Sequence, residues 1–131
     1  MRRADERGAA AVEMALVLPL LLFILFGIID YGRLLNAQLT LTEAAREGAR
    51  AAALGQSADS RVQSAAGGLG TVTTTVVTAC PATPGPTDDA VVQTQLSFRF
   101  VTPVAAIAVL FKGDLDGTVV VRGKGVMPCQ G

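Results

Sequence analysis

Hydrophobic residues follow three patterns along this chain: an uninterrupted run, a helical repeat and a strand-like alternation. The run covers residues 9–29, where Glu13 is the only charged residue. A helix rises about 1.5 Å per residue, so this run spans about 30 Å, close to the hydrocarbon thickness of a bilayer. Arg2, Arg3 and Arg7 precede it. The pattern predicts one membrane-spanning helix whose N-terminus lies in the cytoplasm.

Two other interpretations of the run are a cleaved secretory signal peptide and a buried core helix. A signal peptide has a shorter apolar core and a small-residue cleavage site, whereas Asp30, Tyr31 and Gly32 follow here. A buried core helix is usually shorter as well. Within the run, Pro19 is expected to kink or loosen the helix locally.

Glu13 is the most informative residue of the run, because a carboxylate within a bilayer is costly and usually has a partner. It lies five residues after Gly8, near the cytoplasmic end. One interpretation is that its side chain extends to the lipid headgroups. The other is that it binds a specific cation inside the membrane.

Residues 30–55 continue as an amphipathic helix that is expected to end near Gly55. One face is charged, either as a solvated surface or as a strip that pairs with a partner, and it carries Glu43, Arg46, Glu47 and Arg50. The opposite face has a row of small residues that lets another backbone approach closely: Ala44, Gly48 and Ala52. We expect the chain's own sheet to cover this row, with a helix of another chain as the alternative.

The C-terminal part predicts a short helix at residues 57–66 and three strands at residues 71–80, 90–102 and 117–127. The second strand alternates clearly, with Val92, Leu96, Phe98 and Phe100 opposite Gln93, Gln95, Ser97 and Arg99. The third alternates more loosely, with Val119 and Val121 opposite Arg122 and Lys124. The apolar segment at residues 103–111 is either a short core helix or an exposed patch.

These elements predict an α+β fold: a long N-terminal helix, a short helix and a small three-stranded antiparallel sheet that rests on the long helix. Cys80 ends the first predicted strand and Cys129 follows the third. Outside the cytoplasm a disulfide between them is favoured over two buried free thiols. A middle strand would hold the two strands about 10 Å apart, so the bond requires chain ends that curl inward or another strand order.

Composition argues against catalysis. The chain of 131 residues has no His, and its 11 basic and 11 acidic residues balance. Without His, a Ser or Cys nucleophile lacks its usual base, and the glycines at 67, 68 and 70 lack the Lys-Ser/Thr of a phosphate loop. We therefore expect no enzyme, no cofactor, no metal site, no small-molecule substrate and no nucleic-acid partner.

The N-terminal half resembles a known family, the TadE-like minor pilins or pseudopilins of tight-adherence (Tad/Flp) pilus systems. The resemblance runs from residue 7 to residue 55. It rests on Gly8, Glu13, the apolar run with Pro19, Asp30-Tyr31-Gly32-Arg33 and Ala45-Arg46-Glu47-Gly48-Ala49-Arg50. One departure is Met14, where family members often carry an aromatic residue; an apolar, flexible side chain fits the same packing.

The resemblance implies that a prepilin peptidase cleaves between Gly8 and Ala9 on the cytoplasmic face. Residues 1–8 would then be a leader, 9–29 the transmembrane helix, 30–55 its extracytoplasmic continuation and 56–131 a small extracytoplasmic domain. Glu13, four residues after the new ammonium of Ala9, would pair with it or with that of a neighbouring subunit and so set subunit register.

The implied partners are other pilin subunits, the pilus assembly machinery, the prepilin peptidase and the lipid bilayer. The implied location is the cytoplasmic membrane, with the protein acting in assembly of an adhesive pilus. The alternative is an unprocessed, single-pass anchored binding module with an extracytoplasmic domain. The mature N-terminus distinguishes the two, because only the first predicts a chain that begins at Ala9.

Overall fold

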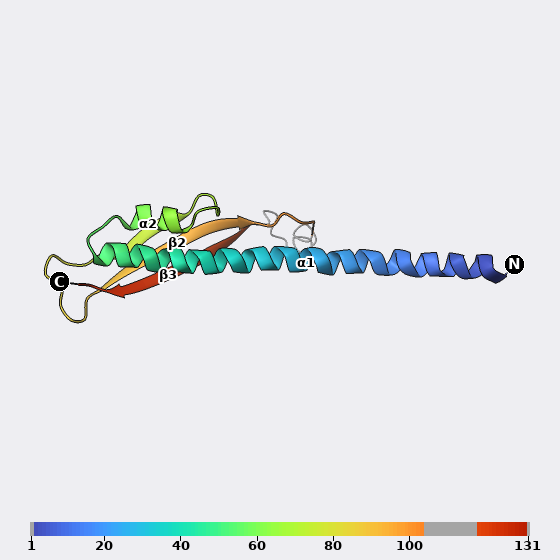
Figure 1. Cartoon of the computed structure of the whole chain (residues 1–131), viewed down its shortest axis with the longest axis horizontal. Coiled ribbons are helices and arrows are strands. Elements are labelled where there is room, and N and C mark those ends of the chain that lie inside the picture. Colours follow the sequence, from blue (N-terminus) through green and yellow to red (C-terminus); the bar gives the residue numbers. More distant parts are fainter. Residues whose placement is uncertain (1, 104–117, 131) are drawn as a thin grey trace. The chain divides into compact units, whose positions relative to one another are not determined.

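The expected α+β fold is confirmed in a computed structural model, which describes residues 2–103 and 118–130, with side chains described from residue 8 onward. The elements are α1 (Arg2–Ala53), α2 (Ala58–Ala65), β1 (Thr73–Thr78), β2 (Asp89–Arg99) and β3 (Thr118–Pro128), as Figure 1 shows. Of the apolar segment 103–111, all but Pro103 lies outside the described residues.

The chain divides into two compact units, and helix α1 contributes to both. The described parts of the first unit are residues 2–32 and 100–103, and those of the second are residues 33–99 and 118–130. The second unit holds the sheet, α2 and the part of α1 from residue 33 onward.

Helix α1 is assigned without interruption over 52 residues, and it continues through Pro19. It ends as the sequence predicts. Gly55 has a φ of +69°, a left-handed conformation that favours glycine. The Gln56 N–H donates to the Ala51 carbonyl and the Gly55 N–H to the Ala52 carbonyl, the two bonds of a Schellman cap.

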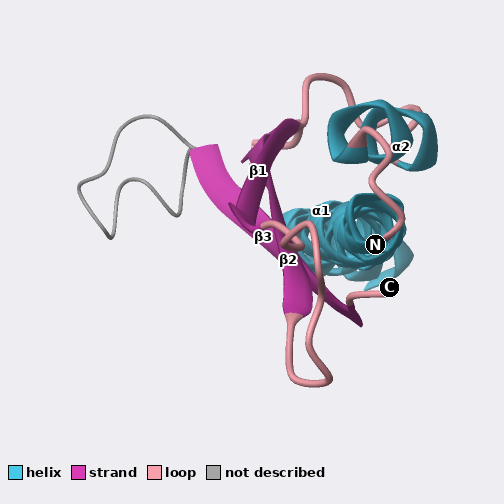
Figure 2. Cartoon of the chain, turned by 90° about the vertical axis from the view of Figure 1, so that its left-hand side faces the viewer, coloured by secondary structure: helices cyan, strands magenta, loops and turns pink. Residues whose placement is uncertain are grey.

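The sheet is an antiparallel meander in the order β1-β2-β3. Its registers place Thr75 opposite Gln93 in the first pair of strands and Val92 opposite Gly125 in the second. In Figure 2, which looks along α1, the strands lie along one side of the helix and α2 lies beside it. The sheet therefore has one face on the helix and one face open to solvent.

The core lies between β2 and the second half of α1. The inner face of β2 alternates as expected, and its buried members are Ala90, Val92, Thr94, Leu96 and Phe98. Helix α1 supplies small and aliphatic residues to the same core: Ala37, Leu41, Ala44, Ala45 and Ala49. Phe100, predicted on this face, lies beyond the end of β2 in the other unit and is half-buried.

Strand β3 follows the predicted alternation at Val121, Arg122 and Lys124 and departs from it at Val119. Val121 is buried, but Val119 is 41% exposed, and the other buried positions are Gly123 and Gly125. The two glycines are buried by a very close approach of α1. A Cβ added to Gly125 would stand 2.2 Å from the Ala45 carbonyl oxygen. The inner face of β3 is therefore largely bare backbone, which hydrophobic alternation cannot reveal.

In the row of small residues on α1, Ala44 and Gly48 are buried and Ala52 is half-buried, and the expected sheet shares the cover of Gly48 with α2. A Cβ added to Gly48 would lie 2.6 Å from Val62 of α2 and 3.2 Å from Val92 of β2. The charged face of α1 is largely exposed, and Arg46 forms an ion pair with Glu43 at 3.1 Å. This favours the solvated interpretation of that face.

Candidate functional site

The residues predicted for processing and register lie at the start of α1. Gly8, Ala9 and Glu13 all belong to the helix and are exposed. Because Ala9 and Glu13 are four residues apart, they share one face of the helix. Within the described chain, this arrangement leaves the Glu13 carboxylate accessible to a cation from outside.

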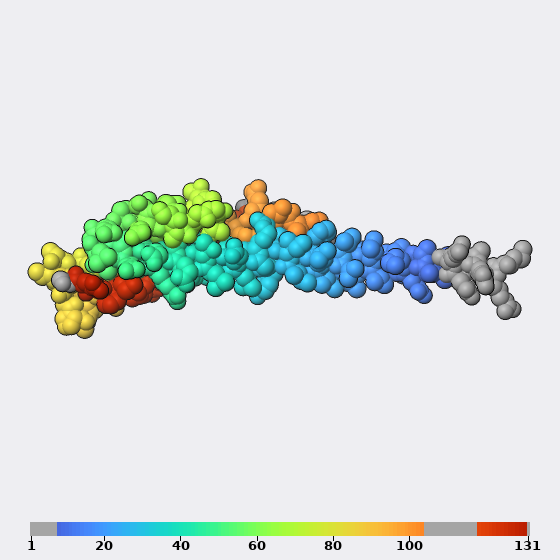
Figure 3. Space-filling view, viewed as in Figure 1, coloured from blue at the N-terminus to red at the C-terminus, as the bar shows by residue number. Residues whose placement is uncertain are grey.

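The apolar run on α1 is exposed over most of its length, and only Phe26 and Gly27 are half-buried. In the part of the chain that the structure describes, one helix is long and apolar enough to cross a membrane, and none of its most apolar window is buried. Figure 3 shows its side chains at the surface along the blue part of the helix. The large exposed side chains include Leu16, Leu20, Leu21 and Ile24. A helix that is apolar all round and uncovered fits a lipid environment.

Asp30 ends this run and is the main site residue that hydrophobic patterning missed. Its side chain is only 3% exposed. Asp30 Oδ1 accepts a hydrogen bond from the Val101 N–H at 3.4 Å. Asp30 Oδ2 accepts one from the Thr102 N–H at 3.2 Å, and the Thr102 hydroxyl donates to the same oxygen. The sequence shows only an acid that terminates an apolar run, because the bonding partners lie more than seventy positions away.

Arg33, one turn after Asp30, also has a tertiary role. Its guanidinium lies over the ring of Phe98, 5.3 Å from the centroid. A guanidinium in this position is attracted by the negative face of the ring. The Asp30-Tyr31-Gly32-Arg33 segment therefore holds two residues with contacts to distant parts of the sequence, in addition to marking the end of the apolar run.

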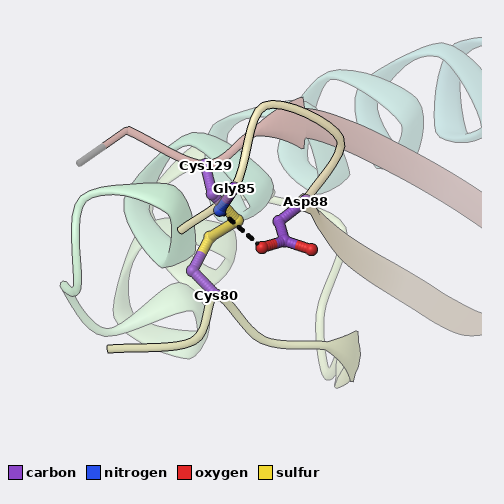
Figure 4. The surroundings of a disulfide bond; sticks show 4 residues. All are labelled: Cys80, Gly85, Asp88 and Cys129. Carbon is purple, nitrogen blue, oxygen red and sulfur yellow. Dashed lines mark hydrogen bonds between the residues drawn. A yellow bond between two sulfur atoms is a disulfide. The ribbon is translucent and has the colours of Figure 1, made fainter. Parts of the chain in front are cut away.

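Cys80 and Cys129 are brought together as a disulfide, with their Cα atoms 5.7 Å apart (Figure 4). The strand order is still the simple meander, so of the two routes considered the chain ends curl inward. Both cysteines lie beyond their strands, next to the loop that precedes β2. In that loop Asp88 accepts from the Gly85 N–H at 2.7 Å, and the Asp88 carbonyl accepts from the Cys129 N–H at 2.8 Å.

The described residues offer few candidates for a metal site or a catalytic site. Residues 2–103 and 118–130 contain no group of three or more His, Cys, Asp or Glu placed to hold a metal ion. A groove of about 500 Å³ is lined by residues of β1, β2, β3 and the segment before β1: Leu69, Thr71, Thr73, Gln95, Leu96, Ser97 and Val120. None of these side chains is an acid or a base, so the groove offers no catalytic pair.

Comparison with known proteins agrees with the resemblance found in the sequence. The family model for TadE-like protein matches residues 8–50. These residues lie within α1 and include both its apolar run and its charged face. Neither a curated protein nor a solved structure matches the chain significantly. TadE-like pilins are not an enzyme family. The match and the apolar helix together fit a membrane protein related to Tad pili.

Proposed function

From its TadE-like N-terminal helix, we propose that this chain is a minor pilin, or pseudopilin, that acts in assembly of a Tad/Flp adhesive pilus. The observation that carries the proposal is the family match over residues 8–50, on a helix whose most apolar window has no buried residue. The helix is exposed over most of the run, and beyond it the helix packs against the sheet and α2. That division suits a subunit held in a membrane by one half of a helix.

In this proposal residues 9–29 cross the cytoplasmic membrane with residues 1–8 in the cytoplasm. Residues 30–55 and 56–131 are then extracytoplasmic. The basic residues before the run support this orientation. The Cys80–Cys129 pair supports it as well, because disulfides persist in oxidising compartments outside the cytoplasm.

A prepilin peptidase then cleaves between Gly8 and Ala9. Cleavage leaves an ammonium at Ala9 and a carboxylate at Glu13 on one face of the helix, in or beside the bilayer. Each charge is costly there without a partner, and pairing within the subunit or between neighbours relieves that cost. Pairing between neighbours would fix the axial register of one helix against the next.

The extracytoplasmic half of α1 offers a further surface for neighbouring pilin subunits. Leu35 and Leu39 are four residues apart on one face and are 46% and 68% exposed. They continue apolar surface beyond the run, where contact with water is unfavourable. Packing against a neighbouring helix would bury them when the pilus machinery moves the helix out of the bilayer.

The test is the N-terminus of the mature protein. The full chain would be expressed with and without an active prepilin peptidase and its intact mass measured. We expect a mature chain that begins at Ala9 only when the peptidase is active, and Gly8→Ala should keep the longer precursor. Gly27→Ala is the matched control, because a Cβ at this glycine of the same helix meets no atom within 4 Å. An intact leader in the presence of peptidase would instead support the unprocessed, anchored binding module.

A further inference from the structure

We infer that the Asp30 carboxylate is a positioning residue that holds Val101 in the headgroup layer of the bilayer, at the level of Tyr31, so that a lipid surface is a binding partner of this part of the chain. The inference rests on the proposed membrane span. It adds a second, peripheral contact with the membrane, made by residues far from the apolar run in sequence.

The depth of this site follows from Asp30. Asp30 is the first residue after the run 9–29. With the run in the hydrocarbon, Asp30 lies where the acyl chains meet the headgroups. The hydrogen bonds to the N–H groups of Val101 and Thr102 then place these residues at the same level. Both residues belong to the same compact unit as Asp30.

The bonding of Asp30 explains how a carboxylate is tolerated at this depth. A buried charge needs hydrogen-bond donors, and here two N–H groups and one hydroxyl supply them. The same bonds satisfy two backbone N–H groups just after β2, which would be costly to leave unpaired near lipid. The contact is therefore suited to an environment that has little water.

The side chains around Asp30 suit the interface. Val101 is 72% exposed and Tyr31 is 61% exposed, although both carry large apolar surfaces. Tyrosine is enriched at membrane interfaces because its ring is apolar and its hydroxyl polar. An exposed valine bonded through its N–H to the end of a membrane helix gains free energy when lipid covers it.

The absence of tryptophan from the chain makes the depth directly measurable. Single tryptophans would be placed in the full chain as Val101→Trp, Leu21→Trp and Val77→Trp. Each protein is reconstituted in phosphatidylethanolamine–phosphatidylglycerol vesicles that contain a phosphatidylcholine brominated either near the headgroup end or near the centre of its acyl chains. Loss of tryptophan fluorescence reports contact with the bromines.

We expect Val101→Trp to lose fluorescence most with bromines near the headgroup end and to emit at shorter wavelength than Val77→Trp. Val77, 52% exposed on β1, is the matched control and should keep its fluorescence. Loss at position 101 that does not exceed the loss at position 77 overturns the inference. Leu21→Trp tests the proposed membrane span separately from the inference about Val101. Quenching at position 21 by bromines near the centre of the acyl chains would support the span. No quenching at position 21 would contradict the span itself.

The role of Asp30 needs its own variant. Asp30→Asn keeps the size of the side chain but replaces an accepting oxygen with a donor that opposes the N–H groups of Val101 and Thr102. In the Val101→Trp background it should reduce quenching to the level of Val77→Trp, and Asp30→Ala should do the same. A retained Cys80–Cys129 bond on a non-reducing gel shows that the sheet is still folded. Unchanged quenching in both variants would overturn the positioning role.

Discussion

The hydroxyl of Thr94 donates a hydrogen bond to the main-chain carbonyl of Leu41 at 3.0 Å, linking the middle of β2 to the second half of α1. Both residues are fully buried. A carbonyl within a helix already accepts the N–H four residues later, so this bond uses its second lone pair. Thr94 thus sits in an apolar core without an unsatisfied hydroxyl and fixes the strand against the helix.

Replacing Thr94 by valine should therefore destabilise the domain. The change keeps the shape of the side chain and removes one buried hydrogen bond, so we expect a loss of about 1 kcal/mol in the free energy of unfolding. Thr75→Val is the matched control, because Thr75 is exposed on β1 and its change should be close to neutral. Urea unfolding of the full chain in detergent gives both values. Equal effects of the two variants would contradict a structural role for the bond.

Alanine at Gly125 should be strongly destabilising. The added Cβ would lie 2.2 Å from the Ala45 carbonyl oxygen, and backbone there cannot move aside without shifting α1 from the sheet. We expect a loss of about 3 kcal/mol or more. Gly32→Ala, with no atom within 4 Å of the new Cβ, should instead be neutral or slightly stabilising in its helix. A Gly125→Ala protein as stable as the wild type would refute the close approach.

Removal of the disulfide should be costly as well. The bond joins cysteines 49 positions apart, and closing a loop of that length is worth about 4 kcal/mol through the unfolded state. The double variant Cys80→Ser with Cys129→Ser should lose most of this stability in the same unfolding measurement. Mass spectrometry of the wild type from cells, without reductant, should find the two cysteine peptides joined. Free thiols in that protein would contradict the pairing.

Replacing Glu13 by glutamine should impair assembly without affecting the fold. The variant keeps the size of the side chain and removes the charge that we propose pairs with the ammonium of Ala9, so incorporation into a pilus or its assembly complex should fall at least about tenfold, equivalent to about 1.4 kcal/mol. Glu43→Gln is the control, since it removes an exposed carboxylate from the same helix. Pilus fractions would be quantified by immunoblot. Normal incorporation of Glu13→Gln would remove the proposed register role.

Local sequence patterns were sufficient to predict the helices and strands. The apolar run, the glycine that ends α1 and the alternation of β2 each depend on residues within a few positions of one another. The same holds for the resemblance, since the matched residues 8–50 lie on one continuous helix. Gly8, Ala9 and Glu13 could be placed on that helix from spacing alone.

The contacts between distant segments were decided only by the tertiary structure. Gly123 and Gly125 show no hydrophobic signal because what buries them is the backbone of α1. In the sequence, Asp30 is only the polar residue that ends an apolar run. Its hydrogen bonds to the N–H groups of Val101 and Thr102 are visible only in the tertiary structure. Cysteine spacing allowed a bond, but the curl of the chain ends made the distance short enough. Periodicity records which face of an element is apolar, whereas the approach of another backbone depends on three-dimensional packing.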